Sequence, residues 1–170
     1  MKLFSKTVCA FCAAVFLFLT GCARAGSDDD FTGLTTSFSL QAQATYHKEK
    51  VVFSLTRTAR SIYRFEFSET DLLRELTVSL NGDEVTMEYD GITRNASISQ
   101  LPQTGIVTAI PAIIDLTDLA KTARYDKQSD TYRIADTAAF GEFTATVCAK
   151  TNLPLKLNAP SIDLTVIFEQ

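Results

Sequence analysis

The chain has no tryptophan and a single histidine, His47, among its 170 residues. Histidine is the side chain most often used for general acid–base catalysis, but His47 beside Lys48, Glu49 and Lys50 fits an exposed turn better than a catalytic base. A zinc site would take most of its ligands from carboxylates, and the sequence shows no such grouping. Phosphate-binding glycine loops and nucleophile elbows are also missing. The sequence therefore predicts a protein that is not an enzyme and that has no metal site and no cofactor.

Cysteine is scarce beyond the first 22 residues, where Cys148 stands alone. Before that point, Lys2 and Lys6 precede an apolar run at 8–19. A cationic start followed by about a dozen apolar residues is typical of an export signal, and the run is too short to span a bilayer. With one thiol left after the signal, no intramolecular disulfide is expected, even outside the cytoplasm where disulfides form.

The signal ends in Leu19, Thr20 and Gly21 followed directly by Cys22. This quartet resembles the bacterial lipobox, and the resemblance implies that signal peptidase recognises the three residues before Cys22 and removes residues 1–21. Cys22 would then carry a diacylglycerol anchor and fatty acids such as palmitate. Two acyl chains hold a protein at a membrane, since each buried CH₂ contributes roughly 0.8 kcal/mol. The alternative is an export signal without a lipid. We expect an extracytoplasmic protein, with the plasma membrane favoured over the outer membrane.

Residues 22–34 form the expected lipidated N-terminus and acidic tether, because small residues surround Asp28, Asp29 and Asp30. Residues 35–170 then form one domain. Loss of the signal removes two lysines, which takes the formal net charge from −4 to about −6. No cluster of lysine or arginine is visible along the chain, so we expect no nucleic-acid partner and no electrostatic docking onto anionic lipid.

Apolar residues alternate with polar ones along most of the domain, as in strands with one buried face. Asn81-Gly82 and Asp90-Gly91 are hairpin signals, and connections this short join antiparallel neighbours. The fold class is mainly β with one or two short helices (α+β). We expect a curved antiparallel sheet of about 10–11 strands, because the twist of so large a sheet forces it to curl. The strands are expected near 38–46, 51–55, 63–67, 76–80, 85–89, 92–98, 125–127, 131–134, 143–149, 153–157 and 162–168.

One segment has helical instead of alternating spacing. The apolar residues between Ile106 and Leu119 recur at intervals of three and four, which predicts a helix near 106–120. Pro111 either opens this helix at its first turn or kinks a longer one. The segment is too apolar for a surface helix, so it should lie against the sheet.

Four features together resemble the LolA-like group, the superfamily of outer-membrane lipoprotein carriers and their lipid-anchored relatives. They are the turn at 81–83, the segment 87–91, the central apolar helix, and the run 151–156 with Leu153-Pro154 ahead of a last strand. The resemblance implies an unclosed half-barrel of about eleven strands, plugged by a helix. A lipidated, acidic chain departs from the periplasmic carriers and fits a fixed lipoprotein of a Gram-positive, clostridial-type bacterium.

The resemblance and the apolar pattern suggest an inner groove with a helical lid. Two functions remain open. The first is binding of an apolar ligand such as a lipid, an acyl chain or a lipidated peptide. The second is a ligand-free module that scaffolds or regulates a cell-envelope protein, with a role in sporulation or germination as one option. The expected groove and lid residues are Phe38, Leu40, Phe53, Leu55, Phe65, Phe67, Met87, Ile110, Ile113, Leu116, Val147, Leu155 and Leu164.

Overall fold

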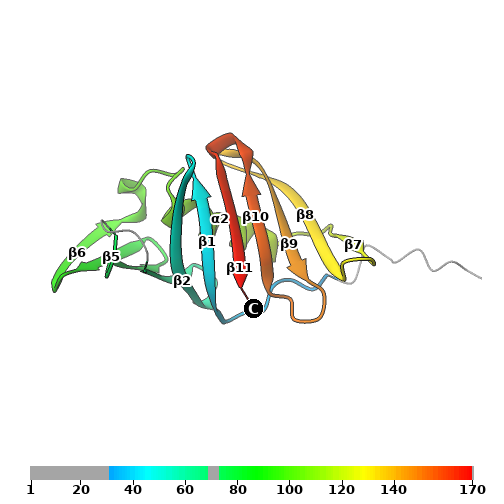
Figure 1. The fold of residues 1–170 in the computed structure, drawn as a ribbon, viewed down its shortest axis with the longest axis horizontal. Coiled ribbons are helices and arrows are strands. Elements are labelled where there is room, and N and C mark those ends of the chain that lie inside the picture. The colour runs from blue at the N-terminus through cyan, green and yellow to red at the C-terminus, as the bar shows by residue number, and fades with distance from the viewer. Residues whose placement is uncertain (1–30, 69–72, 170) are drawn as a thin grey trace, which may run out of the picture.

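The computed structural model describes residues 31–68 and 73–169, so the predicted signal peptide, Cys22 and most of the tether lie outside the described residues. One antiparallel sheet of eleven strands curves around a single helix, as predicted (Figure 1). The strands are β1 Phe38–Tyr46, β2 Glu49–Ala59, β3 Ile62–Phe67, β4 Thr77–Asn81, β5 Glu84–Tyr89, β6 Ile92–Ser97, β7 Arg124–Asp126, β8 Thr131–Ala138, β9 Gly141–Cys148, β10 Pro154–Ala159 and β11 Leu164–Glu169.

The sheet consists of two meanders joined where the first and last strands pair. The strand order is β6-β5-β4-β3-β2-β1-β11-β10-β9-β8-β7, and β1 pairs with β11 from Gln41 opposite Glu169 to Tyr46 opposite Leu164. The predicted curved, unclosed antiparallel sheet is confirmed, and β6 and β7 do not pair with each other and form its two edges. The sheet stays unclosed between them.

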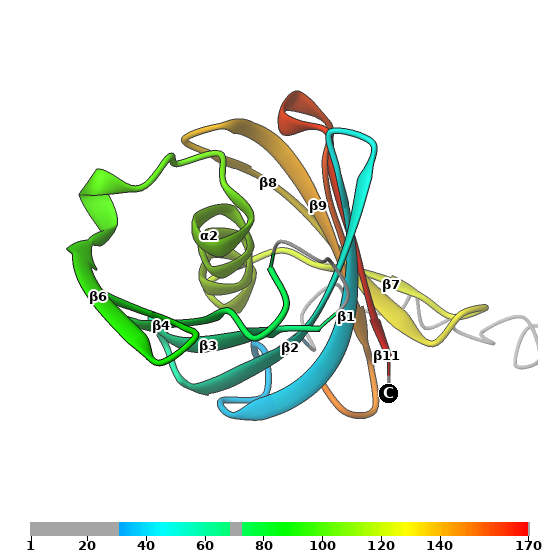
Figure 2. The same cartoon turned by 60° about the vertical axis from the view of Figure 1, so that its left-hand side comes forward.

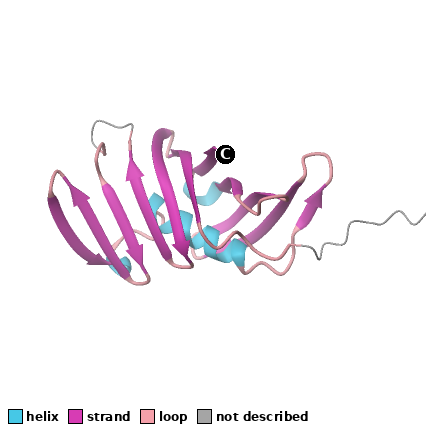
Figure 3. Ribbon diagram, turned by 90° about the horizontal axis from the view of Figure 1, so that it is seen from below, coloured by secondary structure: helices cyan, strands magenta, loops and turns pink. Residues whose placement is uncertain are grey.

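Helix α2, Ile106–Asp118, connects the two edges by passing through the concave side of the sheet (Figures 2 and 3). Two short 3₁₀ helices, η1 Ile98–Gln100 and η2 Pro160–Ile162, complete the helical structure of the described residues. Pro111 lies inside α2, so it does not open the helix. Within the described segments, no helix is both long and apolar enough to cross a bilayer.

The φ angles of the central residues identify the types of the two predicted hairpin turns. Asp90 and Gly91 both have positive φ, as a type I′ turn between β5 and β6 requires. The turn between β4 and β5 is shifted by one residue from the prediction, because Asn81 pairs with Glu84 and the central residues are Gly82 and Asp83. Only Gly82 has positive φ there, as in a type II′ turn.

Candidate functional site

The concave side of the sheet brings together nearly all of the residues predicted to line a groove. Ten of the thirteen are buried in one apolar core: Phe38, Leu40, Phe53, Leu55, Phe65, Phe67, Ile110, Ile113, Val147 and Leu164. Met87 and Leu116 are half-buried and pack against that core. Burial of such side chains contributes roughly 1.5–3 kcal/mol each before the entropy of ordering is subtracted.

Leu155 is the one exception, and its predicted inward orientation is wrong. It is half-buried and lies outside the core, whereas Leu157 is 1% exposed. The register between β9 and β10 shifts between Pro154 and Lys156, so a simple alternation cannot be extended through this strand. A bulge of this kind reverses which side chains face inward.

The apolar face of α2 is packed against the sheet with no solvent exposure at its centre. Ala109, Ile110, Ile113 and Ile114 are each 0% exposed. Hollows among the described residues lie on the outer face of the sheet, on the outer side of the β5–β6 hairpin and beside the C-terminal end of α2. In this state α2 therefore fills the predicted groove.

A buried polar cluster fastens the C-terminal end of α2 to the sheet. Arg57 on β2 is 1% exposed, and its Nη2 atom lies 2.9 Å from Asp118 Oδ2 and 3.5 Å from Asp115 Oδ1. Tyr63 on β3 donates its hydroxyl hydrogen bond to Asp115. We call Arg57, Tyr63, Asp115 and Asp118 the clamp. Since the C-terminal end of a helix carries partial negative charge, the Arg57 guanidinium also stabilises the last turn of α2.

The clamp also holds the chain that leads into β1. The backbone N–H of Leu34 donates to Asp118 Oδ1 over 2.9 Å, and Nη1 of Arg57 donates to the carbonyl oxygen of Thr35 over 3.4 Å. Gly33 has a φ of +104°, and a Cβ atom there would come within 2.9 Å of Asp118 Oδ1. A larger residue at this position would therefore disturb the contact between this segment and α2.

Burial of the clamp determines the protonation state of Tyr63. Desolvation, and then the hydrogen bond to Asp115, raise the pKa of Tyr63 well above its ordinary value of about 10. The tyrosine hydroxyl thus remains a hydrogen-bond donor over the whole physiological range. The Nε atom of Arg57 is buried and has no hydrogen-bond partner among the described residues.

Arg57 is the feature that the sequence prediction missed, although a signal was present. Val51, Phe53 and Leu55 alternate inward along β2, and the same alternation places Arg57 on the inner face. Asp115 and Asp118 are three residues apart and so lie on one face of the predicted helix. An inward arginine together with two carboxylates on the plugging helix indicates a buried ion pair.

In the part of the chain that the structure describes, His47 and Cys148 lie at opposite ends of the strands. His47 is exposed in the turn between β1 and β2, where its Nδ1 atom lies 3.6 Å from Asp163 Oδ2. Cys148 is half-buried, and its side chain belongs to the outer face of β9. Hydrogen bonding by the side chain of Thr151, and then by the backbone of Thr151, lowers the pKa of the Cys148 thiol. Within residues 31–68 and 73–169, no three histidine, cysteine, aspartate or glutamate side chains are grouped to hold a metal.

Comparisons with known proteins extend the description of the fold. No family model and no curated protein matches the chain. An uncharacterized conserved protein from Thermus thermophilus has a similar structure, with a TM-score of 0.51 and 10% sequence identity over 79% of this chain and 77% of that chain. A LolA superfamily protein from Nitrosomonas europaea is a weaker match, with a TM-score of 0.39 and 8% identity over 84% and 89% of the two chains. The first similarity is one of fold alone.

Proposed function

We propose that this protein is a lipid-anchored, non-enzymatic binding protein of the cell envelope, which takes up an apolar ligand between α2 and the concave face of the sheet. The observation that carries the proposal is the uneven attachment of α2. Among the described residues, the α2 side chains that hydrogen-bond to the sheet strands and to the segment before β1 are Asp115 and Asp118, which accept these bonds and lie in the C-terminal half of the helix.

The N-terminal half of α2 is attached differently. Its N-cap, Gly105, makes no side-chain capping bond, and Thr108 bonds only to the nearby carbonyls of Pro102 and Gly105. Apolar contacts such as those of Ala109 and Ile110 hold this half against the sheet. An acyl chain offers the same kind of contact because dispersion and burial are not directional. Movement of α2 about its clamped end would therefore open the concave face to an apolar chain.

The clamp also offers a polar end to such a site. The unpartnered Nε atom of Arg57 is a donor on the inner face of β2. A buried donor without an acceptor is costly, and a ligand oxygen would satisfy it. Lipids, acyl chains and lipidated peptides all combine an apolar chain with a carbonyl or carboxylate oxygen, so they fit both features.

Native mass spectrometry of the mature protein, purified from its own membrane in mild detergent, tests this function. We expect a non-covalent lipid in addition to any covalent anchor. Leu116→Arg should abolish its retention, because Leu116 packs against the core. Leu119→Arg is the matched control, since Leu119 is 52% exposed on the same helix end and its replacement should leave the lipid bound. Wild-type protein without a non-covalent lipid, also after incubation with phospholipid vesicles, would contradict the proposal.

A second candidate is a ligand-free module that binds an envelope protein. The β5–β6 hairpin favours it, because Tyr89 and Ile92 lie opposite each other and are 47% and 58% exposed. The open edge of β6 beside them could accept a further strand. Ile92→Lys should then abolish co-purification of one envelope protein, whereas the lipid-binding function should tolerate this change.

A further inference from the structure

The outer face of strands β7 to β10 carries a basic hollow that is not visible in the linear sequence. Its volume is about 1200 Å³, and its lining includes Arg124, Arg133, Lys156, Thr144, Thr146 and Asn158. Pockets for drug-sized ligands commonly have volumes of about 300–1,000 Å³, so this hollow has room for a ligand of that size or larger. The expectation that the protein lacks a basic cluster is thus incorrect for this face.

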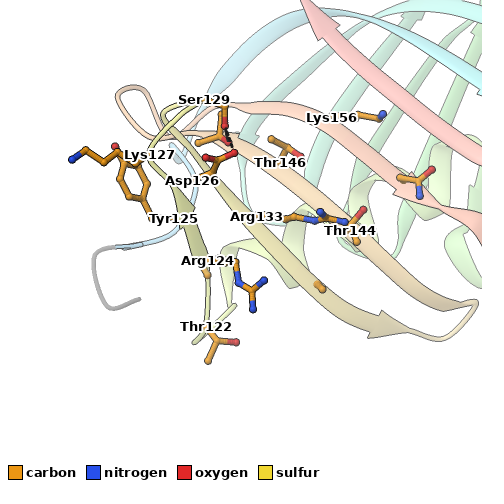
Figure 4. Close-up of a pocket in the computed structure, with 14 residues that line it drawn as sticks. Thr122, Arg124, Tyr125, Asp126, Lys127, Ser129, Arg133, Thr144, Thr146 and Lys156 are labelled. Atoms are coloured by element: carbon orange, nitrogen blue, oxygen red, sulfur yellow. Dashed lines mark hydrogen bonds between the residues drawn. The ribbon is translucent and has the colours of Figure 1, made fainter. Parts of the chain in front are cut away.

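The strand register places three of these cations in one row. Arg124 on β7 pairs with Arg133 on β8, Arg133 pairs with Thr146 on β9, and Thr146 pairs with Lys156 on β10. Adjacent strands are about 4.8 Å apart, so the two arginines are direct neighbours and Lys156 lies about 10 Å beyond Arg133. Figure 4 shows Arg133 directed toward Thr144, whereas Lys127 extends away from the other lining side chains.

The arginine pair has no charge partner within the described part of the chain. Like charges directly opposite each other on neighbouring strands are destabilising. Neither Arg124 nor Arg133 forms an ion pair within 4.0 Å there, and neither does Lys156. The one carboxylate of the lining, Asp126, instead accepts hydrogen bonds from Ser129 and from the backbone of Gln128. Two arginines without ion-pair partners at directly paired strand positions are well suited to an anion with several acceptor oxygens.

We propose that this hollow binds a soluble ligand carrying at least two phosphate groups. One phosphate contacts Arg124 and Arg133, and the second contacts Lys156, with the hydroxyls of Thr144 and Thr146 and the amide of Asn158 available to polar groups between them. The recessed shape favours a discrete ligand over a membrane, because a flat bilayer surface would meet protruding side chains such as Lys127 first. This site is on the opposite face of the sheet from α2 and does not depend on the function proposed above.

Isothermal titration of the mature full chain in nonionic detergent tests the inference with two probes, inorganic phosphate and fructose 1,6-bisphosphate. The bisphosphate should bind at least about tenfold more tightly than phosphate, since a charge-assisted contact typically changes affinity by that factor or more. Arg124→Gln with Arg133→Gln should weaken both probes at least about tenfold. Lys156→Gln should weaken only the bisphosphate. Arg60→Gln with Arg74→Gln, an equal charge change at exposed positions outside the hollow, should leave both affinities unchanged.

The double arginine variant also serves as its own folding control. Its thermal midpoint without ligand should equal or exceed that of the wild type, because a like-charge pair has been removed. Fructose 1,6-bisphosphate should raise the midpoint of the wild type and not that of the variant. Absence of binding, or equal binding by wild type and variant, would overturn the proposal. Arginine-dependent binding to phosphatidylglycerol vesicles without bisphosphate binding would overturn it too, and would assign the hollow to lipid headgroups.

Discussion

Arg57 and Asp118 form a buried ion pair between the middle of the sheet and the end of its plugging helix. The distance from Nη2 to Oδ2 is 2.9 Å, and 1% of the arginine side chain is exposed compared with 24% of the aspartate. Arg57 also reaches Asp115 and the carbonyl oxygen of Thr35. One side chain thus connects β2, α2 and the segment before β1, and this arrangement decides which end of α2 is fixed.

Removal of Arg57 should destabilise the protein strongly. Arg57→Met leaves Asp115 and Asp118 without their cation, and breaking a buried pair costs about 3–5 kcal/mol. We expect a value near the lower limit because both carboxylates retain some exposure. Urea unfolding measures the change, with Arg64→Met as control. That variant breaks the exposed Arg64–Glu66 pair and should cost less than about 1 kcal/mol. Equal effects of the two variants would contradict a buried clamp.

The clamp should make stability fall at alkaline pH. Tyr63 has a pKa raised above its ordinary value, so between these two values the unfolded chain loses a proton that the folded protein keeps. The free energy of unfolding should therefore be unaffected below about pH 10 and should decrease above it, by up to about 1.4 kcal/mol per pH unit from this group. Urea unfolding between pH 8 and pH 11 checks this slope.

Tyr63→Phe isolates the contribution of that hydroxyl. The variant should lose about 1–2 kcal/mol at pH 7, because Asp115 loses a donor, and it should show a shallower alkaline slope. Tyr89→Phe, at a 47% exposed position, should leave both quantities unchanged. An alkaline slope that persists in Tyr63→Phe would assign the effect to other groups.

Gly33 should be difficult to replace. Gly33→Ala puts a Cβ atom 2.9 Å from Asp118 Oδ1 at a φ of +104°, and strain of this kind costs about 1–3 kcal/mol. Gly82→Ala is the matched control, since Gly82 also has positive φ but has no atom within 4 Å of a new Cβ. The difference between the two changes in thermal midpoint measures the contact with Asp118 together with the less favourable backbone conformation at Gly33, and a difference of zero would contradict a contribution from the contact.

Truncation of Leu157 should destabilise the protein much more than truncation of Leu155. Leu157→Ala removes a fully buried side chain and should cost about 2–5 kcal/mol, whereas Leu155→Ala should cost less than about 1 kcal/mol. Denaturant unfolding of both variants tests the register shift in β10. Comparable effects at the two positions would restore the simple alternation, which places both leucines on the inner face.

The lipid anchor is tested by metabolic labelling with a radioactive fatty acid. We expect label on the wild-type protein and none on Cys22→Ala, because the sulfur of Cys22 carries the glyceride and export places the new N-terminus where it is acylated. Cys148→Ala should retain the label, since Cys148 lies on β9 far along the chain. Equal labelling of both variants would argue against lipidation at Cys22.

Local periodicity was sufficient for much of this fold. A period of two predicted the strands because alternate side chains of a strand point to opposite faces, and it placed residues such as Phe53, Phe65 and Val147 correctly in the core. The apolar stretch at 106–119 identified α2 for the same reason, with the helical period. These properties depend on residues close together in the chain.

Tertiary structure decided everything that depends on pairs of distant residues. The pairing of β1 with β11, the Arg57–Asp118 contact and the row of Arg124, Arg133 and Lys156 join segments whose proximity depends on how the strands are ordered in the sheet. The bulge that left Leu155 outside the core also arose from strand pairing. Sequence alone determined most of the apolar residues that avoid water, because a preference for burial belongs to each apolar side chain. Only the folded sheet decided which charges meet, because electrostatic partners are set by geometry.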